Sequence, residues 1–113
     1  MSNEFILHIL DLLGTVGNVT ARRMFGGYGI YLDNLMFAIV VDDILYLKAD
    51  SQIQARFQDL GRSSFSYQRQ GKNISMSYYQ APDEALENPE EMKAWAALAC
   101  QAALRNSRQI NKK

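Results

Sequence analysis

The chain has 113 residues, 48% of them apolar, so we expect one domain, residues 1–113, that folds without disulfides or a metal. Twelve Lys and Arg balance twelve Asp and Glu, which excludes a strong overall field toward nucleic acid or an anionic membrane. The single cysteine, Cys100, excludes an internal disulfide, no N-terminal secretion signal is recognisable, and no apolar run approaches the roughly 20 residues that cross a bilayer. We therefore expect a cytoplasmic protein without a membrane partner.

The N-terminal part changes from helical to strand periodicity. Apolar residues recur at helical spacing from about Asn3 to Leu13, after a cap at Ser2. The segment Gly14–Asn18 has two glycines and no apolar period, which is typical of a loop. Strands are then predicted over Val19–Phe25 and Tyr28–Leu32, with a break at the glycines between them.

Two hairpin turns are predicted in the next segment. Asp33-Asn34 and Asp42-Asp43 are residue types that tolerate the left-handed conformations of two-residue hairpin loops. They bound the predicted strands Leu35–Val41 and Ile44–Lys48. Together with the preceding strands, these form an antiparallel meander.

A second helix and a second hairpin follow the meander. We predict that Asp50 or Ser51 caps the helix, in the latter case as part of a capping box, and that Gly61 ends it. The strands Ser64–Gln68 and Asn73–Tyr79 alternate apolar with polar residues around a turn at Gly71-Lys72.

The last helix completes the predicted fold. Asn88-Pro89 is expected to open this helix, and from about residue 105 the tail is polar and is expected to fray. The order is then a helix, three or four strands, a helix, two strands and a helix. With three strands in the first group it is an α-β(3)-α-β(2)-α arrangement of the α+β class, an antiparallel sheet with helices packed mainly on one face.

Neither catalytic residues nor a metal site can be recognised in the sequence. The single histidine, His8, lies in the first predicted helix, and Cys100 lies in the alanine-rich last helix, where a buried thiol is expected. The carboxylates are found at turns or near the start of the last helix, where the helix dipole favours them. We therefore predict a protein that is not an enzyme and has no cofactor.

The glycine run Gly26-Gly27-Tyr28-Gly29 allows two motif readings, and neither fits. A phosphate-binding loop needs a helix directly after the glycines, whereas a strand follows here. The basic, glycine and aromatic pattern of RNA-recognition motifs is a near miss, because Gly26 and Ile30 occupy its basic and second aromatic positions. A β-bulge or a close backbone crossing is predicted instead.

Arginines and tyrosines on the predicted strands indicate a recognition surface. Arg22 and Arg23 are adjacent and should point to opposite faces, one toward solvent or a partner and the other toward a carboxylate across the sheet. All six tyrosines fall on predicted strands, and tyrosine is common at recognition surfaces.

Several motifs resemble one known family. They are Ala21-Arg22-Arg23-Met24-Phe25-Gly26-Gly27-Tyr28-Gly29-Ile30-Tyr31, Met36-Phe37-Ala38, Leu45-Tyr46-Leu47-Lys48-Ala49-Asp50 and Met76-Ser77-Tyr78-Tyr79 followed by Pro82. Together they resemble the N-terminal domain of the TfoX/Sxy competence regulators. The resemblance implies a fold similar to that of type III secretion chaperones and a role in bacterial transcription, as a coactivator alongside the cyclic AMP receptor protein. The fuller regulators of this family carry a second, helical C-terminal domain.

We therefore predict a non-enzymatic regulatory domain that binds a protein partner, within the transcription machinery, through the tyrosine-bearing sheet face and the arginine strand. The predicted contact residues are Arg22, Arg23, Phe25, Tyr28, Lys48 and Tyr79. One alternative is a weak nucleic-acid-binding module in which basic residues contact phosphates and tyrosines stack on bases. A small-ligand-binding domain or enzyme and a homodimer through the same face also remain open.

Overall fold

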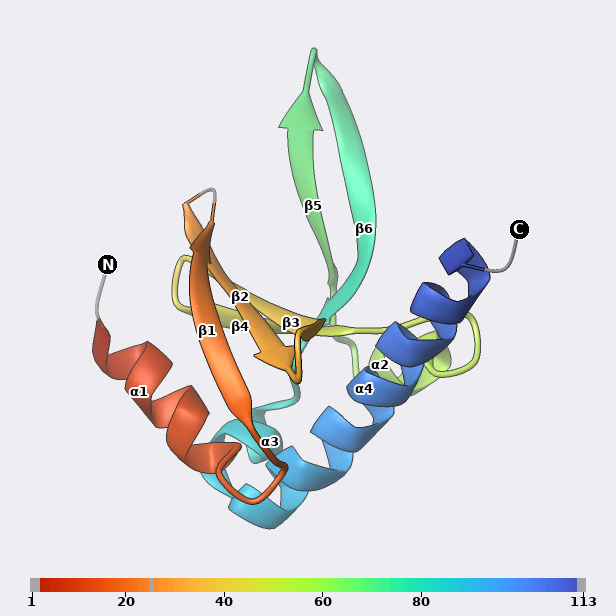
Figure 1. The fold of residues 1–113 in the computed structure, drawn as a ribbon. Helices are drawn as coiled ribbons and strands as arrows, with labels where there is room; N and C mark the ends of the chain where they lie inside the picture. The colour runs from red at the N-terminus through yellow and green to blue at the C-terminus, as the bar shows by residue number, and fades with distance from the viewer. Residues whose placement is uncertain (1–2, 25, 112–113) are drawn as a thin grey trace.

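The computed structural model describes residues 3–24 and 26–111 and forms one curved antiparallel sheet with helices on one side (Figure 1). This confirms the α+β class. In chain order the elements are α1 (Asn3–Leu12), β1 (Val19–Met24), β2 (Gly27–Leu32), β3 (Leu35–Val41), β4 (Ile44–Lys48), α2 (Gln54–Asp59), β5 (Ser64–Arg69), β6 (Lys72–Gln80), α3 (Asp83–Glu87) and α4 (Pro89–Asn111).

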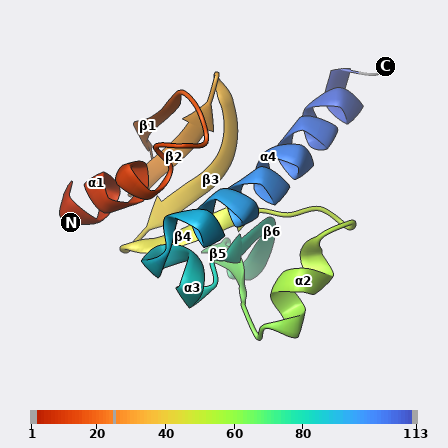
Figure 2. The same ribbon diagram turned by 90° about the horizontal axis from the view of Figure 1, so that it is seen from below.

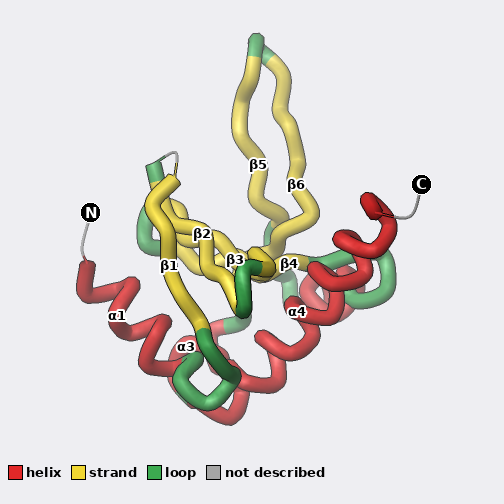
Figure 3. The backbone as a smooth tube through the Cα atoms, viewed as in Figure 1, coloured by secondary structure: helices red, strands yellow, loops and turns green. Residues whose placement is uncertain are grey.

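The described strands are arranged in the order β1-β2-β3-β4-β6-β5 (Figure 3). Four strands precede α2, so the larger of the two predicted counts is correct and the α-β(3)-α-β(2)-α order is wrong. The short helix α3 was not predicted, because five residues provide little more than one helical turn and no detectable period. Ser2 and Phe25 received roles from the sequence and lie outside the described residues.

The hairpin turns follow from residue chemistry. Asp33 and Asn34 have φ values of 49° and 70°, and Asp42 and Asp43 have values of 53° and 59°. Two consecutive left-handed residues match the right-handed twist of the flanking strands, so both predicted turns are confirmed. The third turn is centred on Gln70-Gly71, one residue earlier than predicted.

The helices pack against one face of the sheet, as predicted. Helix α4 crosses β3 and β4, α1 lies beside β1, and α2 lies beside β6 (Figure 2). Alanines of α4 at positions 96, 99, 102 and 103 are buried and allow the helix to approach the strands closely. No described helix combines the length and hydropathy that a bilayer-spanning helix requires.

A β-bulge in β3 turns two consecutive side chains toward the core. Ile30 pairs with Ala38 and Tyr31 pairs with Met36, which leaves Phe37 as an extra residue. Phe37 and Ala38 are both fully buried, so the ordinary strand alternation is broken here. Beyond the bulge, Met36 therefore lies on the face opposite the helices.

The glycine run produces the close backbone crossing that the sequence predicted. A Cβ atom at Gly27 would collide with the backbone carbonyl oxygen of Val40 on β3. Only glycine therefore fits this position without displacing one of the strands.

Helix α2 begins differently from prediction and ends as predicted. Asp50 Oδ1 accepts a hydrogen bond from the Gln52 N–H, but α2 begins only at Gln54 and has no side-chain cap, so the capping box at Ser51 does not form. At the other end of α2, Gly61 has φ of 71°, and the N–H groups of Gly61 and Arg62 bond to Gln58 O and Phe57 O. This is a Schellman motif, and it confirms the predicted glycine stop.

Helix α4 begins as expected and ends later than expected. Asn88 Oδ1 accepts hydrogen bonds from Glu90 N at 2.8 Å and Glu91 N at 3.3 Å, which confirms the predicted cap. The helix then continues to Asn111, so the prediction of fraying from about residue 105 is wrong. Arg105 binds Asp50, a contact across 55 residues that ties this part of α4 to the segment before α2.

Candidate protein interface

The sheet face opposite the helices is lined by alternate residues of neighbouring strands. Arg22 pairs with Gly29, and Gly29 pairs with Ile39, so these residues point to the same side. A Cβ atom at Gly29 would lie 2.9 Å from the Sδ atoms of both Met24 and Met36. The two methionines therefore meet over Gly29 on this helix-free face.

The β5–β6 hairpin extends beyond the rest of the sheet, as Figure 1 shows. Strand β6 pairs with β4 through Tyr78–Gln80, and Ala49 N donates to Ser77 O. Among the described residues, no ladder joins Lys72–Met76 to β4. This overhanging part of the hairpin is held mainly by pairing between its own two strands.

The two faces of the overhanging hairpin differ in chemistry. Tyr67 pairs directly with Ile74, and Phe65 and Met76 lie two residues away on the same side. The exposed fractions are 40% for Tyr67, 36% for Ile74 and 37% for Met76. The opposite side carries the polar residues Ser66, Gln68, Asn73 and Ser75. The apolar side faces the helix-free face of the sheet.

These two apolar surfaces form a groove of about 540 Å³, which we call the trough. It is lined by Met24, Gly27, Tyr28, Met36, Ile39, Val41, Phe65, Tyr67, Arg69 and Met76. At the corner between the sheet and the hairpin, the rings of Tyr46 and Phe65 make an edge contact with centroids 5.0 Å apart. Burial raises the pKa of Tyr46, with a smaller contribution from Asp42, so its hydroxyl stays neutral.

One arginine lines the trough, and a second lies on the same face of the sheet, two residues before the lining residue Met24. Arg22 of β1 donates to Asn34 Oδ1 at 2.8 Å, and its guanidinium lies 4.5 Å from the Tyr31 ring centroid. Of the described residues that line the trough, only Arg69 of β5 is charged. The described lining is therefore apolar except for one positive charge, that of Arg69.

The six predicted contact residues do not share one surface. Arg22 lies on the helix-free face, whereas Lys48, at the end of β4, borders two hollows that α4 residues help to line. Arg23 points to the other face, and its guanidinium lies 6.0 Å from the centroid of the Tyr28 ring. Tyr28 packs partly against the core and also borders the trough. Tyr79 lies on the helix side. Phe25 is outside the described residues.

Tyr79 packs against α2, and the ion pair predicted for Arg22 or Arg23 does not form among the described residues. Tyr79 stacks on Phe57 with centroids 5.5 Å apart, and its hydroxyl oxygen accepts a hydrogen bond from Gln58 Nε2 at 3.2 Å. The predicted ion pair for one arginine of the pair 22–23 is wrong, because the ion pairs among the described residues are Arg62–Asp83 and Arg105–Asp50.

Sequence reasoning missed the methionines of the trough. Met24, Met36 and Met76 come from three strands and meet only because of the sheet order and the bulge. The alternation of Ile74 and Met76 with serines was visible in the sequence and indicates one apolar face of the hairpin. It does not say what that face lies against.

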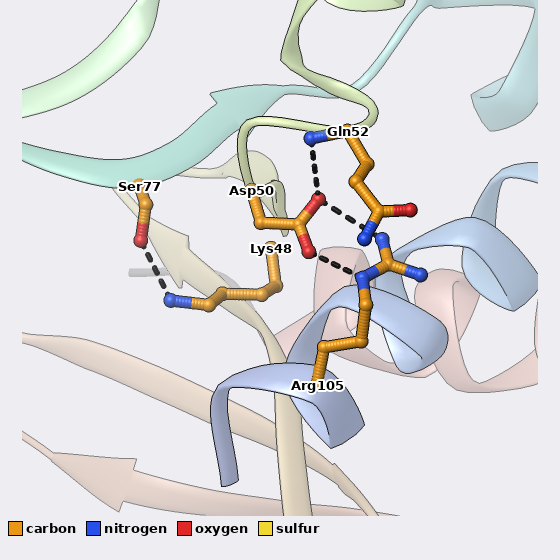
Figure 4. A network of polar contacts seen from close by, with 5 residues as sticks. All are labelled: Lys48, Asp50, Gln52, Ser77 and Arg105. Atoms are coloured by element: carbon orange, nitrogen blue, oxygen red, sulfur yellow. Dashed lines mark hydrogen bonds and ion pairs between the residues drawn. The ribbon is translucent and has the colours of Figure 1, made fainter. Parts of the chain in front are cut away.

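A polar network lies where β4 ends and α4 passes (Figure 4). Arg105 donates to Asp50 through Nε at 2.6 Å and Nη2 at 2.9 Å, and Lys48 Nζ donates to Ser77 Oγ at 2.6 Å. The hydrogen bond from Arg105 lowers the pKa of Asp50 and raises that of Arg105. Both groups therefore remain charged over the ordinary pH range.

The other reactive side chains have structural surroundings. His8 Nε2 lies 2.9 Å from the carbonyl oxygen of Leu86, and burial raises the pKa of the Cys100 thiol to about 11. A thiol with a raised pKa is a poor nucleophile. Within residues 3–24 and 26–111, His, Cys, Asp and Glu side chains form no group of three that could hold a metal.

Comparison with known proteins gives a consistent result. A family model described as the TfoX N-terminal domain matches residues 11–103. DNA transformation protein TfoX1 of Aliivibrio fischeri is 28% identical over 93 residues, which cover 82% of this chain and 43% of the relative. Protein Sxy of Escherichia coli K12 is 26% identical over 105 residues, covering 93% and 50%. DNA transformation protein TfoX of Haemophilus influenzae is 32% identical over 87 residues, covering 75% and 39%. The chain spans half the length of these relatives or less.

Proposed function

Because the chain belongs to the TfoX N-terminal domain family, we propose that it is a non-enzymatic protein-interaction domain that regulates DNA-transformation genes in the bacterial cytoplasm. Two of the relatives are named as DNA transformation proteins, which supports a role in this process. In this proposal the domain contributes to transcriptional coactivation by binding a component of the transcription machinery.

The trough is the observation that carries the proposal. A two-stranded hairpin is marginally stable in water on its own, yet β5–β6 extends past the sheet with exposed Tyr67, Ile74 and Met76. A contiguous apolar surface of this kind marks an interaction site more often than scattered apolar residues do. An inserted segment would cover the sheet wall and the hairpin wall together.

The proposed occupant is an amphipathic segment of a protein partner with acidic residues beside its apolar side chains. A volume of about 540 Å³ accommodates a few large side chains and not a folded domain. The apolar lining matches the apolar side of such a segment, while Arg22 and Arg69 are placed to attract flanking carboxylates. The charges would orient the segment, and the apolar contacts would supply most of the affinity.

Direct nucleic-acid binding fits this surface less well. Phosphate contacts need several accessible cations, whereas the described lining of the trough is mainly apolar and includes one cation, Arg69. Total charge is also balanced. Nucleic-acid affinity would fall steeply with salt, while docking of an apolar segment would change little.

A fusion experiment tests the proposal. Residues 1–113 replace the matching half of TfoX1 in an Aliivibrio fischeri strain that lacks the natural protein, and DNA transformation is counted. We expect the fusion to restore transformation and Met76→Asp to reduce it at least tenfold, because a carboxylate in the trough would remain unpaired after docking. Ser75→Asp places the same charge on the polar side of the same strand and should have little effect.

The two possible failures have different meanings. Protein amount is measured by immunoblot, and the folding of each purified variant by thermal unfolding. If a folded Met76→Asp fusion transforms as well as the unmodified fusion, the trough is not the docking surface. If the unmodified fusion is folded and present but does not restore transformation, this chain does not supply the proposed regulatory role.

A further inference from the structure

The ammonium group of Lys48 is a partly buried cation that forms no ion pair with a carboxylate of the described residues. Its Nζ atom donates to Ser77 Oγ at 2.6 Å and lies 5.1 Å from the centroid of the Tyr78 ring. In the described part of the chain, the ion pairs Arg62–Asp83 and Arg105–Asp50 do not include it. Burial lowers the pKa of Lys48, while Asp50 acts in the opposite direction. A partly desolvated cation of this kind gains from an incoming anion.

Two hollows meet at Lys48. The first, of about 220 Å³, is polar and is lined by Lys48, Ala49, Asp50, Ser51, Gln52, Ser77, Arg105 and Asn106. The second, of about 240 Å³, is lined by Leu35, Met36, Lys48, Tyr78, Ala103, Asn106 and Ser107. Lys48 and Asn106 border both. One hollow thus offers hydrogen-bond donors, and the adjoining one offers mainly apolar walls.

The nearby carboxylate is already compensated. Asp50 accepts two hydrogen bonds from Arg105 and one from Gln52 N at 3.0 Å, as Figure 4 shows. Lys48, Asp50 and Arg105 together carry one net positive charge. Because both oxygens of Asp50 are engaged, its repulsion of an incoming anion is offset by the adjacent guanidinium.

From this arrangement we infer that the Lys48 pocket binds the oxyanion group, phosphate or carboxylate, of a small molecule whose apolar part enters the second hollow. The ammonium of Lys48, the hydroxyl of Ser77 and the amide of Asn106 would bind the oxygens. Leu35 and Ala103 would contact the apolar part. This site and the trough share one lining residue, Met36, which borders both the second hollow and the trough. The test of this site does not depend on the proposed docking of a protein.

Ligand titration tests the pocket directly. Phenyl phosphate, phenylacetate and inorganic phosphate are added separately to the full chain, and backbone amide NMR shifts are followed at constant ionic strength. We expect saturable shifts around Lys48 and Asn106, with phenyl phosphate binding more tightly than inorganic phosphate because only the former occupies the apolar hollow. If phenylacetate binds equally well, the pocket selects any small oxyanion and not phosphate.

Charge-matched variants test whether the ammonium group of Lys48 is responsible for binding the ligand. Lys48→Met keeps the aliphatic stem and is expected to weaken phenyl phosphate at least tenfold, the effect of losing a charged hydrogen bond. Lys72→Met removes the same charge from the exposed hairpin tip and should change affinity less than twofold. Asn106→Ala, at an exposed helix position, should weaken binding without affecting the fold. The inference is overturned if the unmodified chain shows no saturable shift, or if Lys48→Met and Lys72→Met have equal effects.

Discussion

Replacing Gly27 with alanine is expected to destabilise the protein far more than the same change at Gly29, two residues later on β2. A methyl group at Gly27 would collide with the carbonyl oxygen of Val40, which is held in the neighbouring strand. At Gly29 the methyl group would meet Met24 Sδ, Met36 Sδ and Tyr31 Cε1 at 2.9, 2.9 and 3.0 Å. These atoms belong to side chains that can move aside.

The size of the stability loss in each variant depends on which atoms must move to accommodate the methyl group. Forcing an extra methyl group into a tightly packed site costs about 1–3 kcal/mol, and Gly27 should be near the upper end because the backbone itself must shift. The unfolding entropy of 113 residues is roughly 0.24 kcal/mol/K, so a loss of about 2 kcal/mol lowers the Tm by about 8 °C. For Gly29→Ala we expect less than about 1 kcal/mol.

The free energy of unfolding of both variants is measured by urea titration, with the fluorescence of Trp95 as the signal. Trp95 is the single tryptophan and lies with its ring centroid 5.0 Å from that of Phe57 in the core, so its emission reports on global unfolding. Gly29→Ala also displaces the two methionines toward the trough and should impair the transformation fusion without impairing folding. Equal losses of stability for the two variants would refute the distinction between backbone and side-chain collisions.

Three further outcomes are expected. Arg105 lowers the pKa of Asp50 in the folded protein. The unmodified chain should therefore be more stable than Asp50→Asn above the ordinary carboxyl pKa of about 4, and this difference should shrink as the pH falls through the lower pKa of the folded protein. Urea unfolding across that pH range measures the difference. The pKa of Cys100 is about 11 in the folded protein in place of 9.0, so at pH 8 the folded protein should contain about a hundredfold less thiolate than the urea-unfolded protein. Its reaction with iodoacetamide should be slower by a corresponding factor. Asn88→Ala removes the cap of α4 and should cost about 1 kcal/mol, or about 4 °C in calorimetric Tm.

The local parts of the fold were predictable because their signals are contained in a few adjacent residues. Asp33-Asn34 and Asp42-Asp43 fix hairpin turns through their tolerance of left-handed backbone, and Asn88 and Gly61 fix helix ends through capping. The continuous apolar run of β3 could not reveal the bulge at Phe37. A bulge is visible in a sequence as an interruption of the alternation between apolar and polar residues, and this run does not alternate.

The parts that depend on distant contacts were not predictable. Arg105 of α4 contacts Asp50 across 55 residues, and the sequence alone does not show that these residues are neighbours. The candidate surface has the same limitation. Arg23 and Tyr79 were grouped with Arg22 by residue type, although strand register directs them to the other side of the sheet.

The β5–β6 hairpin forms one wall of the trough and is attached to β4 by a short ladder, so the angle of the hairpin sets the width of the trough. Three residue pairs of β4 and β6 form the ladder, while Lys72–Met76 extend about 17 Å beyond it at roughly 3.4 Å per residue. A rigid rotation of the hairpin would therefore pivot about Tyr78–Gln80. A rotation of about 10° at the hinge moves the tip, with Arg69 and Lys72, by about 3 Å, which is comparable to the difference between a small and a large side chain. We therefore expect the trough to admit segments of different thickness while the helix-packed part of the sheet keeps its shape.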